Sequence, residues 1–473
     1  MAIENNFYSL RGEMDKLTGI KRTTSYTMEY NEAYELIMND ADFKAKMTED
    51  IETKMTDKQN SKTIVKDKEY FRQRRDEYRA RVQNVIAARN INVRDMTRNE
   101  LIELLVEDMY GYKVLSELYY SNDKNDPYGN VTDIYCLAWD KIYYESSKFE
   151  TPQKFEKTFR DEKDYKDFIE RMMREAGKSM LDAGENKVVD FDLYEDRYNA
   201  ISKSVSPNDF TLTMRKHSED HVTLQNILDQ GGMNQEVADL YGLLILGECN
   251  TIMGGVTGSG KTTTMRAVLD YYVTKANKRM LVCEDTRELF PKNDHTLELQ
   301  TSPGVDEKTT VSLRDLIMLA LRQKPKYIVV GEVRGAEAEA AVEAMATGHS
   351  THFTMHAGTP IDAVNRLVTK YLMQMPSLGI DVVERIIGSA LDYIIIQDAI
   401  PGIGRRITSI TECTYNYETR RVDLRTIMKF NFKTKKFDIV GKLSEEKAEK
   451  MLRKGITYEQ LAPLVEGWDK QEV

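Results

Sequence analysis

The spacing of hydrophobic and polar positions changes along this chain and divides it into regions. From the start to about residue 120, apolar side chains recur every three or four positions among charged ones, which is the pattern of amphipathic helices. The clearest case is the segment 66–90, where Tyr70, Tyr78, Val82 and Ile86 would share one face. We therefore expect a helical N-terminal region over residues 1–120, with a second, short helix over residues 97–108.

A turn-forming stretch, residues 121–129, follows that region and contains Asn, Asp, Pro and Gly. Beyond it, apolar and polar residues alternate in short runs around one amphipathic segment at residues 163–176. This alternation predicts strands at residues 131–135, 141–145, 187–193, 197–201 and 210–216. The expected second region is a small α+β domain over residues 121–225.

From residue 226 onward, short apolar runs alternate with helical patterns. Buried strands are expected at residues 249–253, 279–282, 327–330 and 351–355, with helices at residues 234–242, 263–272, 313–322 and 336–346. Such alternation predicts an α/β domain with a mostly parallel sheet covered on both faces. We expect this domain to span residues 226–473 and to have a helical C-terminal part.

Composition narrows the class of protein. The 473 residues suffice for two to four domains. The formal net charge of −10, with acidic and basic residues intermixed, argues against binding of nucleic acid through a basic face. No apolar run approaches the roughly 20 residues that cross a bilayer, and the first residues form no signal peptide, so any membrane role is expected to be peripheral. The four cysteines are far apart in the sequence and predict neither a disulfide nor a zinc site.

The segment 255–262 reads Gly-Val-Thr-Gly-Ser-Gly-Lys-Thr, in which two glycines four positions apart precede a lysine and a hydroxyl residue. Glycines let the backbone turn so that successive N–H groups face a phosphate, and the helix expected next adds its positive end. Lys261 would neutralise the β- and γ-phosphates, and Thr262 would bind Mg²⁺. A glycine-rich turn without chemistry is disfavoured because a strand and a helix are expected on either side. The expected ATP-binding residues are Gly255, Thr257, Gly258, Ser259, Gly260, Lys261, Thr262 and Thr263.

Two of the expected strands run into acidic residues. Glu284 and Asp285 follow the strand at 279–282, and Glu332 follows Gly331 after the strand at 327–330. Ligands gather at the carboxyl ends of strands in an open parallel sheet, so both acids would lie beside the phosphates. One could hold Mg²⁺ through water, while the other orients or deprotonates the attacking water. An ordinary helix-capping role for Glu284 and Asp285 is the alternative.

Three histidines, His349, His352 and His356, follow in quick succession. The β-branched and aromatic residues 351–355 predict a strand, on which residues 352 and 356 would be too far apart to chelate a metal. Two roles remain open, a sensor that touches the γ-phosphate and a structural hydrogen-bonding histidine.

Together these motifs resemble the secretion-superfamily traffic ATPases, most closely the branch of tight-adherence pili and conjugation machines. The resemblance covers about residues 120–435 and rests on the loop 255–262, the acidic box 284–289, the glycine-glutamate motif 331–335 and the histidine box 347–357. The family carries glycine at position 331. The sequence departs from the family pattern at residues 357–360, and the first 110 residues match no family. The resemblance implies a P-loop NTPase (RecA-like) domain preceded by the smaller α+β domain.

The resemblance also implies that the protein hydrolyses ATP in a Mg²⁺-dependent reaction. It would be cytoplasmic and would work as a homohexameric ring at the inner face of the cell membrane. An integral-membrane platform protein of a pilus or secretion machine would be its partner, and no sequence-specific nucleic acid binding is expected. Arg197 and Arg215 would reach the γ-phosphate as arginine fingers when their domain closes on the site. The expected catalytic residues are Glu332, Glu284, Arg197, Arg215 and His356, and the expected Mg²⁺ ligands are Thr262 and Glu284.

Two rival functions stay open on the sequence alone. A DNA-translocating motor would need a basic channel, which the acidic net charge disfavours. A non-hydrolysing ATP-bound scaffold switch would not need the two glutamates at the strand ends. The sequence does not decide between pilus assembly, protein secretion and conjugation.

Overall fold

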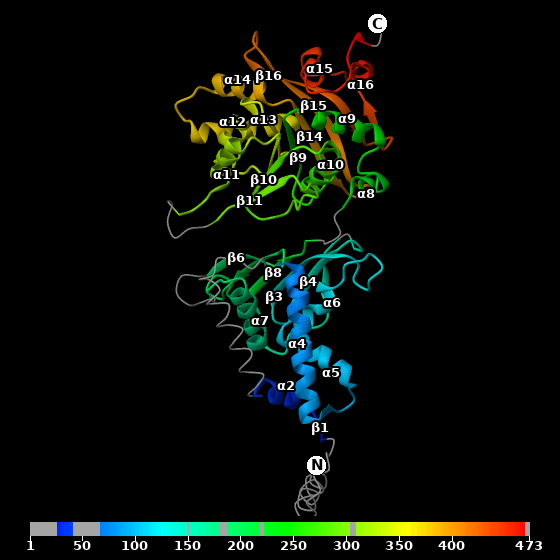
Figure 1. Ribbon diagram of the computed structural model, residues 1–473, viewed down its shortest axis with the longest axis vertical. Helices are drawn as coiled ribbons and strands as arrows, with labels where there is room; N and C mark the ends of the chain where they lie inside the picture. The colour runs from blue at the N-terminus through cyan, green and yellow to red at the C-terminus, as the bar shows by residue number, and fades with distance from the viewer. Residues whose placement is uncertain are drawn as a thin grey trace, which may run out of the picture. The chain divides into compact units, whose positions relative to one another are not determined.

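A computed structural model describes residues 26–40, 67–149, 151–179, 187–217, 222–302 and 309–468. The chain divides into two units, Met1–Ser218 and Glu219–Val473 (Figure 1). Their buried hydrophobic residues form separate cores. Over the described ranges, no helix is both long enough and apolar enough to cross a membrane.

Helices dominate the first part of the first unit. The pattern over residues 66–90 is confirmed as α4 (Lys68–Arg89), which begins where the side chain of Asp67 accepts from Tyr70 N–H. The expected helix near residue 97 is α5 (Arg98–Met109), which Thr97 and Glu100 start as a reciprocal capping box. The other elements are β1 (Tyr26–Met28), α2 (Tyr30–Met38), β2 (Ile91–Val93), η2 (Lys113–Leu115) and α6 (Ser116–Tyr119).

An antiparallel sheet in the order β5-β4-β3-β8-β7-β6 completes this unit. Its elements are β3 (Val131–Ala138), β4 (Lys141–Ser146), β5 (Gln153–Phe155), α7 (Glu162–Glu175), β6 (Val188–Leu193), β7 (Asp196–Ile201) and β8 (Thr211–Arg215). Buried residues of α4 and α5 belong to the same hydrophobic core as those of the sheet. The boundary expected near residue 120 therefore falls inside one core, because a polar loop between elements does not prevent their apolar faces from packing together.

The sheet of the second unit has the order β11-β10-β12-β13-β9-β14-β15-β16-β17 within the described residues. From β11 to β14 neighbouring strands are parallel, and from β14 to β17 they are antiparallel. The strands are β9 (Thr251–Gly254), β10 (Met280–Glu284), β11 (Thr296–Gln300), β12 (Tyr327–Glu332), β13 (Ser350–Met355), β14 (Tyr393–Ile400), β15 (Gly404–Asn416), β16 (Arg421–Asn431) and β17 (Lys436–Ile439).

Helices cover both faces of this sheet, as the alternating pattern predicts (Figure 1). One face packs on α8 (Leu224–Asp229), α9 (Gln235–Leu246), α10 (Lys261–Ala276), α15 (Glu445–Leu452) and α16 (Tyr458–Leu461). The other packs on α11 (Leu313–Ala320), α12 (Glu337–Ala346), α13 (Pro360–Gln374) and α14 (Ile380–Ala390). Two 3₁₀ turns, η3 (Leu321–Gln323) and η4 (Ala462–Leu464), complete the described elements. Neighbouring residues of β12, Ile328 and Val329, face opposite cores, which is why its run is apolar throughout.

The expectation of a helical C-terminal part is wrong for residues 393–439, which form β14 to β17. Only α15, α16 and η4 follow these strands in the described chain. The physical reason is that β9 would otherwise leave an unpaired edge on the parallel sheet, and the next strand pairs with it. β14 pairs with β9 through Ile394 and Ile396, so the strands that follow extend the sheet instead of starting a helical layer.

Candidate functional site

The segment between β9 and α10 forms a tight loop. Gly258 and Gly260 have φ of 75° and 86°, in the left-handed region that side chains disfavour, and Gly260 directly precedes the helix. A Cβ at Gly258 would meet no atom within 4 Å, so the loop presents its backbone without an overlying side chain there. Strand, loop and helix thus stand in the order that an anion-binding loop requires.

Lys261 is the first residue of α10 and is only 7% exposed. Its Nζ donates to the carbonyl oxygens of Gly255 and Val256, each at 3.0 Å. Burial lowers the pKa of Lys261, and Glu332 acts in the opposite direction. Thr262 and Thr263 follow in the first helical turn and are half-buried. A buried ammonium beside the main chain of a glycine loop fits the charge and shape of a phosphate.

A cluster of charged groups stands at the end of β12. His356 Nε2 lies 3.0 Å from Oε1 of Glu332, and the guanidinium of Arg334 pairs with the same carboxylate. Burial acts to raise the pKa of Glu332, yet Arg334, His356 and Lys261 together lower it below its usual value. Burial and the nearby Lys261 lower the pKa of His356. At neutral pH the site therefore holds an ionised carboxylate beside a neutral imidazole.

Glu284 ends the neighbouring strand β10 in a different setting. The carboxyl is 3% exposed, and the N–H groups of Glu288 and Leu289 both donate to its Oε1 at 3.1 Å. Burial raises the pKa of Glu284 to about 8. Residues 285–295 contain no helix, so the helix-capping alternative is wrong.

Gly331 has a packing reason in this arrangement. A Cβ added there would lie 3.0 Å from Cγ of Glu284, which is closer than ordinary side-chain contact. An acidic side chain at this position would compete with Glu284 for the same space. The glycine and the buried glutamate are thus two halves of one packing arrangement.

The three histidines separate into different roles. His352 is fully buried, with Nδ1 2.7 Å from Thr251 Oγ1 and Nε2 3.0 Å from Ser350 Oγ, and burial lowers its pKa to about 3. It is the structural, hydrogen-bonded histidine, whereas His356 faces Glu332. His349 is 3.2 Å from Thr347 Oγ1. Across the described ranges, no three His, Cys, Asp or Glu side chains are grouped so that they could hold a metal ion.

Two residues beside the loop escaped the sequence analysis as site residues. Gln397 of β14 donates from Nε2 to the carbonyl of Ser259 at 2.6 Å. Arg405 of β15 donates from Nε to the carbonyl of Gly258 at 3.1 Å. Gln397 stands 138 positions from Ser259 and belongs to no local motif, so no signal in the sequence points to it.

The expected arginine fingers belong to the first unit. Arg197 of β7 is the direct cross-strand partner of Arg215 of β8. The Nε of Arg215 donates to Oδ1 of Asp133 on β3 at 2.9 Å, and the Arg215 side chain is 53% exposed. Within that unit the structure brings the two arginines together on one sheet.

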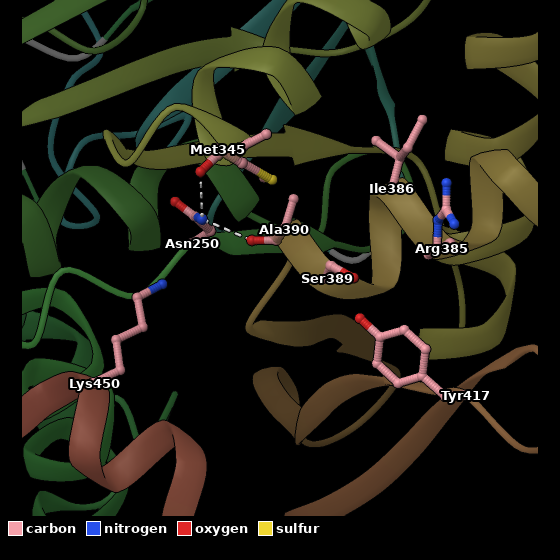
Figure 2. A pocket seen from close by; sticks show the side chains of 9 residues that line it. Asn250, Met345, Arg385, Ile386, Ser389, Ala390, Tyr417 and Lys450 are labelled. Atoms are coloured by element: carbon pink, nitrogen blue, oxygen red, sulfur yellow. Dashed lines mark hydrogen bonds between the residues drawn. The ribbon is translucent and has the colours of Figure 1, made fainter.

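A cavity of about 540 Å³ lies elsewhere in the second unit (Figure 2). Asn250 in its wall precedes β9, whereas the glycine loop follows β9, so the cavity and the loop stand at opposite ends of this strand. Asn250 Nδ2 donates to the carbonyl of Ala390, and Lys450 pairs with Asp392 (Figure 2 shows the first of these). The carboxyl ends of α12 and α14, which carry partial negative charge, lie in the cavity wall together with the cationic side chains of Arg385 and Lys450. The wall therefore carries both signs of charge and favours neither an anionic nor a cationic ligand.

Comparison with known proteins finds a family match that covers most of the second unit and part of the first. Residues 166–437 match the model of the family described as type II/IV secretion system protein. An uncharacterized protein of Methanocaldococcus jannaschii is 35% identical over 44% of this chain and 38% of its own length. The conjugal transfer protein TrbB of Rhizobium radiobacter is 30% identical over 42% of this chain and 58% of its own length. This chain thus covers less than two thirds of either relative.

Among solved structures, the ATPase DotB of Legionella pneumophila is similar, with 18% identity and a TM-score of 0.42. The match covers 65% of this chain and 79% of that one.

Proposed function

The chain belongs to the type II/IV secretion system protein family, and from that premise we propose that it is an ATP hydrolase that drives the assembly of a pilus or a type IV secretion or conjugation machine. One observation carries the proposal. The buried Lys261 and the ionised Glu332 stand together at the carboxyl ends of parallel strands, beside a loop that presents its main-chain N–H groups.

The binding role is assigned to the loop. The residues Gly255, Thr257, Gly258, Ser259, Gly260, Lys261, Thr262 and Thr263 would hold ATP, with the loop N–H groups and Lys261 on the phosphates. Bound Mg²⁺ supplies neutralisation of phosphate charge, and Thr262 is the ligand proposed for it. A contact from Glu284 to Mg²⁺ would have to use Oε2, since Oε1 accepts two main-chain N–H groups.

The hydrolytic role is assigned to Glu332. A carboxylate kept ionised by Arg334 can orient a water molecule and accept its proton. His356, neutral at neutral pH, has Nε2 3.0 Å from Oε1 of Glu332 and would sense the γ-phosphate from that position. The buried carboxyl of Glu284 would hold the shape of the acidic loop by accepting the N–H of Glu288.

The mechanical role follows from the arginines of the first unit. Arg197 and Arg215 would stabilise the negative charge that develops as the bond to the γ-phosphate breaks. Because they belong to a separate unit, closure would assemble the site and loss of phosphate would release it. A cytoplasmic homohexamer bound to an integral-membrane platform protein is the assembly we propose for this motion.

The test is steady-state phosphate release by the purified full chain with Mg²⁺ and ATP. Lys261→Ala should abolish turnover while circular dichroism stays unchanged, because the phosphates lose their buried counter-charge. Lys275→Ala, at the exposed end of the same helix, is the matched control and should turn over normally.

Normal turnover in Lys261→Ala would reject the site. Binding of ATP by the wild type without any phosphate release would favour the scaffold switch. Stimulation of turnover by DNA would favour the translocating motor.

A further inference from the structure

The hairpin of β14 and β15 contacts the glycine loop and donates two side-chain hydrogen bonds to its carbonyl groups. β14 is parallel to β9, and the last pair of their ladder joins Ile396 to Gly254. Gln397 follows immediately, where the register between β14 and β15 shifts between Ile396 and Gln397. Such an irregularity re-aims a side chain out of the regular alternation. Here it directs Gln397 to the loop that follows β9.

The loop glycines are packed tightly against these two residues. A Cβ at Gly255 would lie 2.3 Å from the carbonyl oxygen of Gln397. A Cβ at Gly260 would lie 3.0 Å from both Arg405 Cδ and Gln397 Nε2. The backbone of the loop thus touches the hairpin directly, and no larger residue would fit between them.

The hydrogen bonds to the hairpin determine which way the loop peptides face. In a trans peptide the carbonyl and the following N–H point in opposite directions. Gln397 holds the carbonyl of Ser259, so the N–H of Gly260 points away from the hairpin. Arg405 holds the carbonyl of Gly258, and the N–H of Ser259 turns inward to the carbonyl of Val256 at 3.3 Å. The bond from Gln397 thus keeps the Ser259 carbonyl on the hairpin side and leaves the Gly260 N–H on the opposite side, whereas the bond from Arg405 fixes the peptide whose N–H closes the turn within the loop.

Gln397 is a poor choice for packing alone. The side chain is 3% exposed, and its buried Oε1 meets no hydrogen-bond donor among the described residues. A buried acceptor without a partner lowers the stability of the folded state. An apolar side chain of the same length would avoid that cost, but it could not hold the carbonyl of Ser259.

We propose that Gln397 and Arg405 are positioning residues for the nucleotide: Gln397 holds the carbonyl of Ser259 so that the Gly260 N–H faces the phosphates, and Arg405 holds the carbonyl of Gly258 so that the turn keeps its shape. The inference rests on the proposed function, because it assigns the loop to a nucleoside di- or triphosphate. The two residues touch the loop and not the nucleotide, so they set phosphate affinity through backbone orientation.

The experiment measures the affinity of the full chain for MgADP and for inorganic pyrophosphate by titration calorimetry, with the melting temperature of each variant. Gln397→Met keeps the length and removes the donor together with the unpaired Oε1. It should bind both probes about 3- to 10-fold more weakly, the value of one hydrogen bond. Its melting temperature should stay close to that of the wild type, because removal of the unpaired Oε1 offsets the loss of the donor to the Ser259 carbonyl. The exposed Gln374→Met of α13 is the matched control and should change neither quantity.

A second pair of variants keeps the test decisive if Gln397→Met folds poorly. Arg405→Ala alters an exposed side chain and should weaken both probes about 3-fold without loss of melting temperature. Gln397→Glu should weaken MgADP more than 10-fold at pH 8, because a carboxylate faces the Ser259 carbonyl, and should recover towards the wild type at pH 6, where a buried carboxyl regains its proton.

Each outcome has a separate meaning. A wild type that fails to bind MgADP would remove the proposed function itself. A wild type that binds, with Gln397→Met and Arg405→Ala binding equally well, would overturn the positioning role alone. A lower melting temperature in Gln397→Met with unchanged affinity would make Gln397 a purely structural residue.

Discussion

Glu284 and Glu332 end neighbouring parallel strands, yet their surroundings push their proton affinities in opposite directions. β10 and β12 are paired along their length, with Cys283 opposite Val330. The pKa of Glu284 is raised to about 8, whereas that of Glu332 is lowered. Both carboxyls lose solvent, but Glu284 is the more deeply buried of the two, and its burial raises its pKa. The second difference is the charge nearby, because Arg334 and Lys261, together with His356 where it is protonated, lower the pKa of Glu332.

This contrast teaches which acid suits which task. A general base must be ionised at the working pH, and Glu332 satisfies that condition. Glu284 is protonated in most molecules at neutral pH and already accepts two main-chain hydrogen bonds. Position at a strand end therefore brings an acid to the site, and the depth of burial together with the neighbouring charges decides what it can do there.

The largest effect is expected from Glu332→Gln. The amide cannot accept a proton from water, so ATP turnover should fall by about 10³-fold. The affinity for MgADP should stay within a few-fold of the wild type, since the loop is untouched. Phosphate release and calorimetric titration measure the two quantities, and the exposed Glu343→Gln of α12 is the matched control. Turnover above one tenth of the wild type would remove Glu332 from the role of base.

The second prediction concerns the pH dependence of the free energy of unfolding, to which the two acids should contribute in opposite directions. The folded-state pKa of Glu284 is raised above the unfolded value, so its stabilising effect is complete below about pH 4.5 and is lost as pH rises towards 8. Relative to Glu284→Gln, the wild type should lose roughly 2–4 kcal/mol of unfolding free energy between pH 5 and pH 8. Urea unfolding of both proteins at the two pH values measures the difference.

Glu332 should behave in the opposite way in the same measurement. Its folded-state pKa is lowered, so its stabilising effect is present above the unfolded pKa and is lost as pH falls through the folded one. Relative to Glu332→Gln, the wild type should therefore gain stability as pH rises from 3 to 5. The same trend in both variants would mean that the contrast between the two acids is absent.

The smallest effect is expected on the turnover of Glu284→Gln. The amide oxygen can still accept from the N–H groups of Glu288 and Leu289, and the residue it replaces is largely uncharged at pH 7. Turnover should fall by about 10-fold or less. A fall as large as that of Glu332→Gln, restored in part by high Mg²⁺, would instead assign Glu284 to the metal as an ionised ligand.

Local patterns were sufficient where one segment carries the whole signal. The glycine spacing of residues 255–262 predicted the loop, and the apolar run at 327–330 predicted β12 together with the acid at its end. The amphipathic segment at 66–90 predicted α4 almost to its ends. The strands of residues 393–439 were missed, because a short alternating segment takes its structure from the neighbour with which it pairs.

By itself, the sequence determined that glycines, a lysine and two acids follow the expected strands, since the succession of strand, loop and helix along the chain and the composition of each loop are local properties. Only the tertiary structure decided that the pKa of Glu332 is lowered and that of Glu284 is raised, because a pKa depends on burial and on charges that come from distant segments. It also decided that Gln397 reaches Ser259 across 138 positions, because a hydrogen bond depends on distance in space and not on separation along the chain.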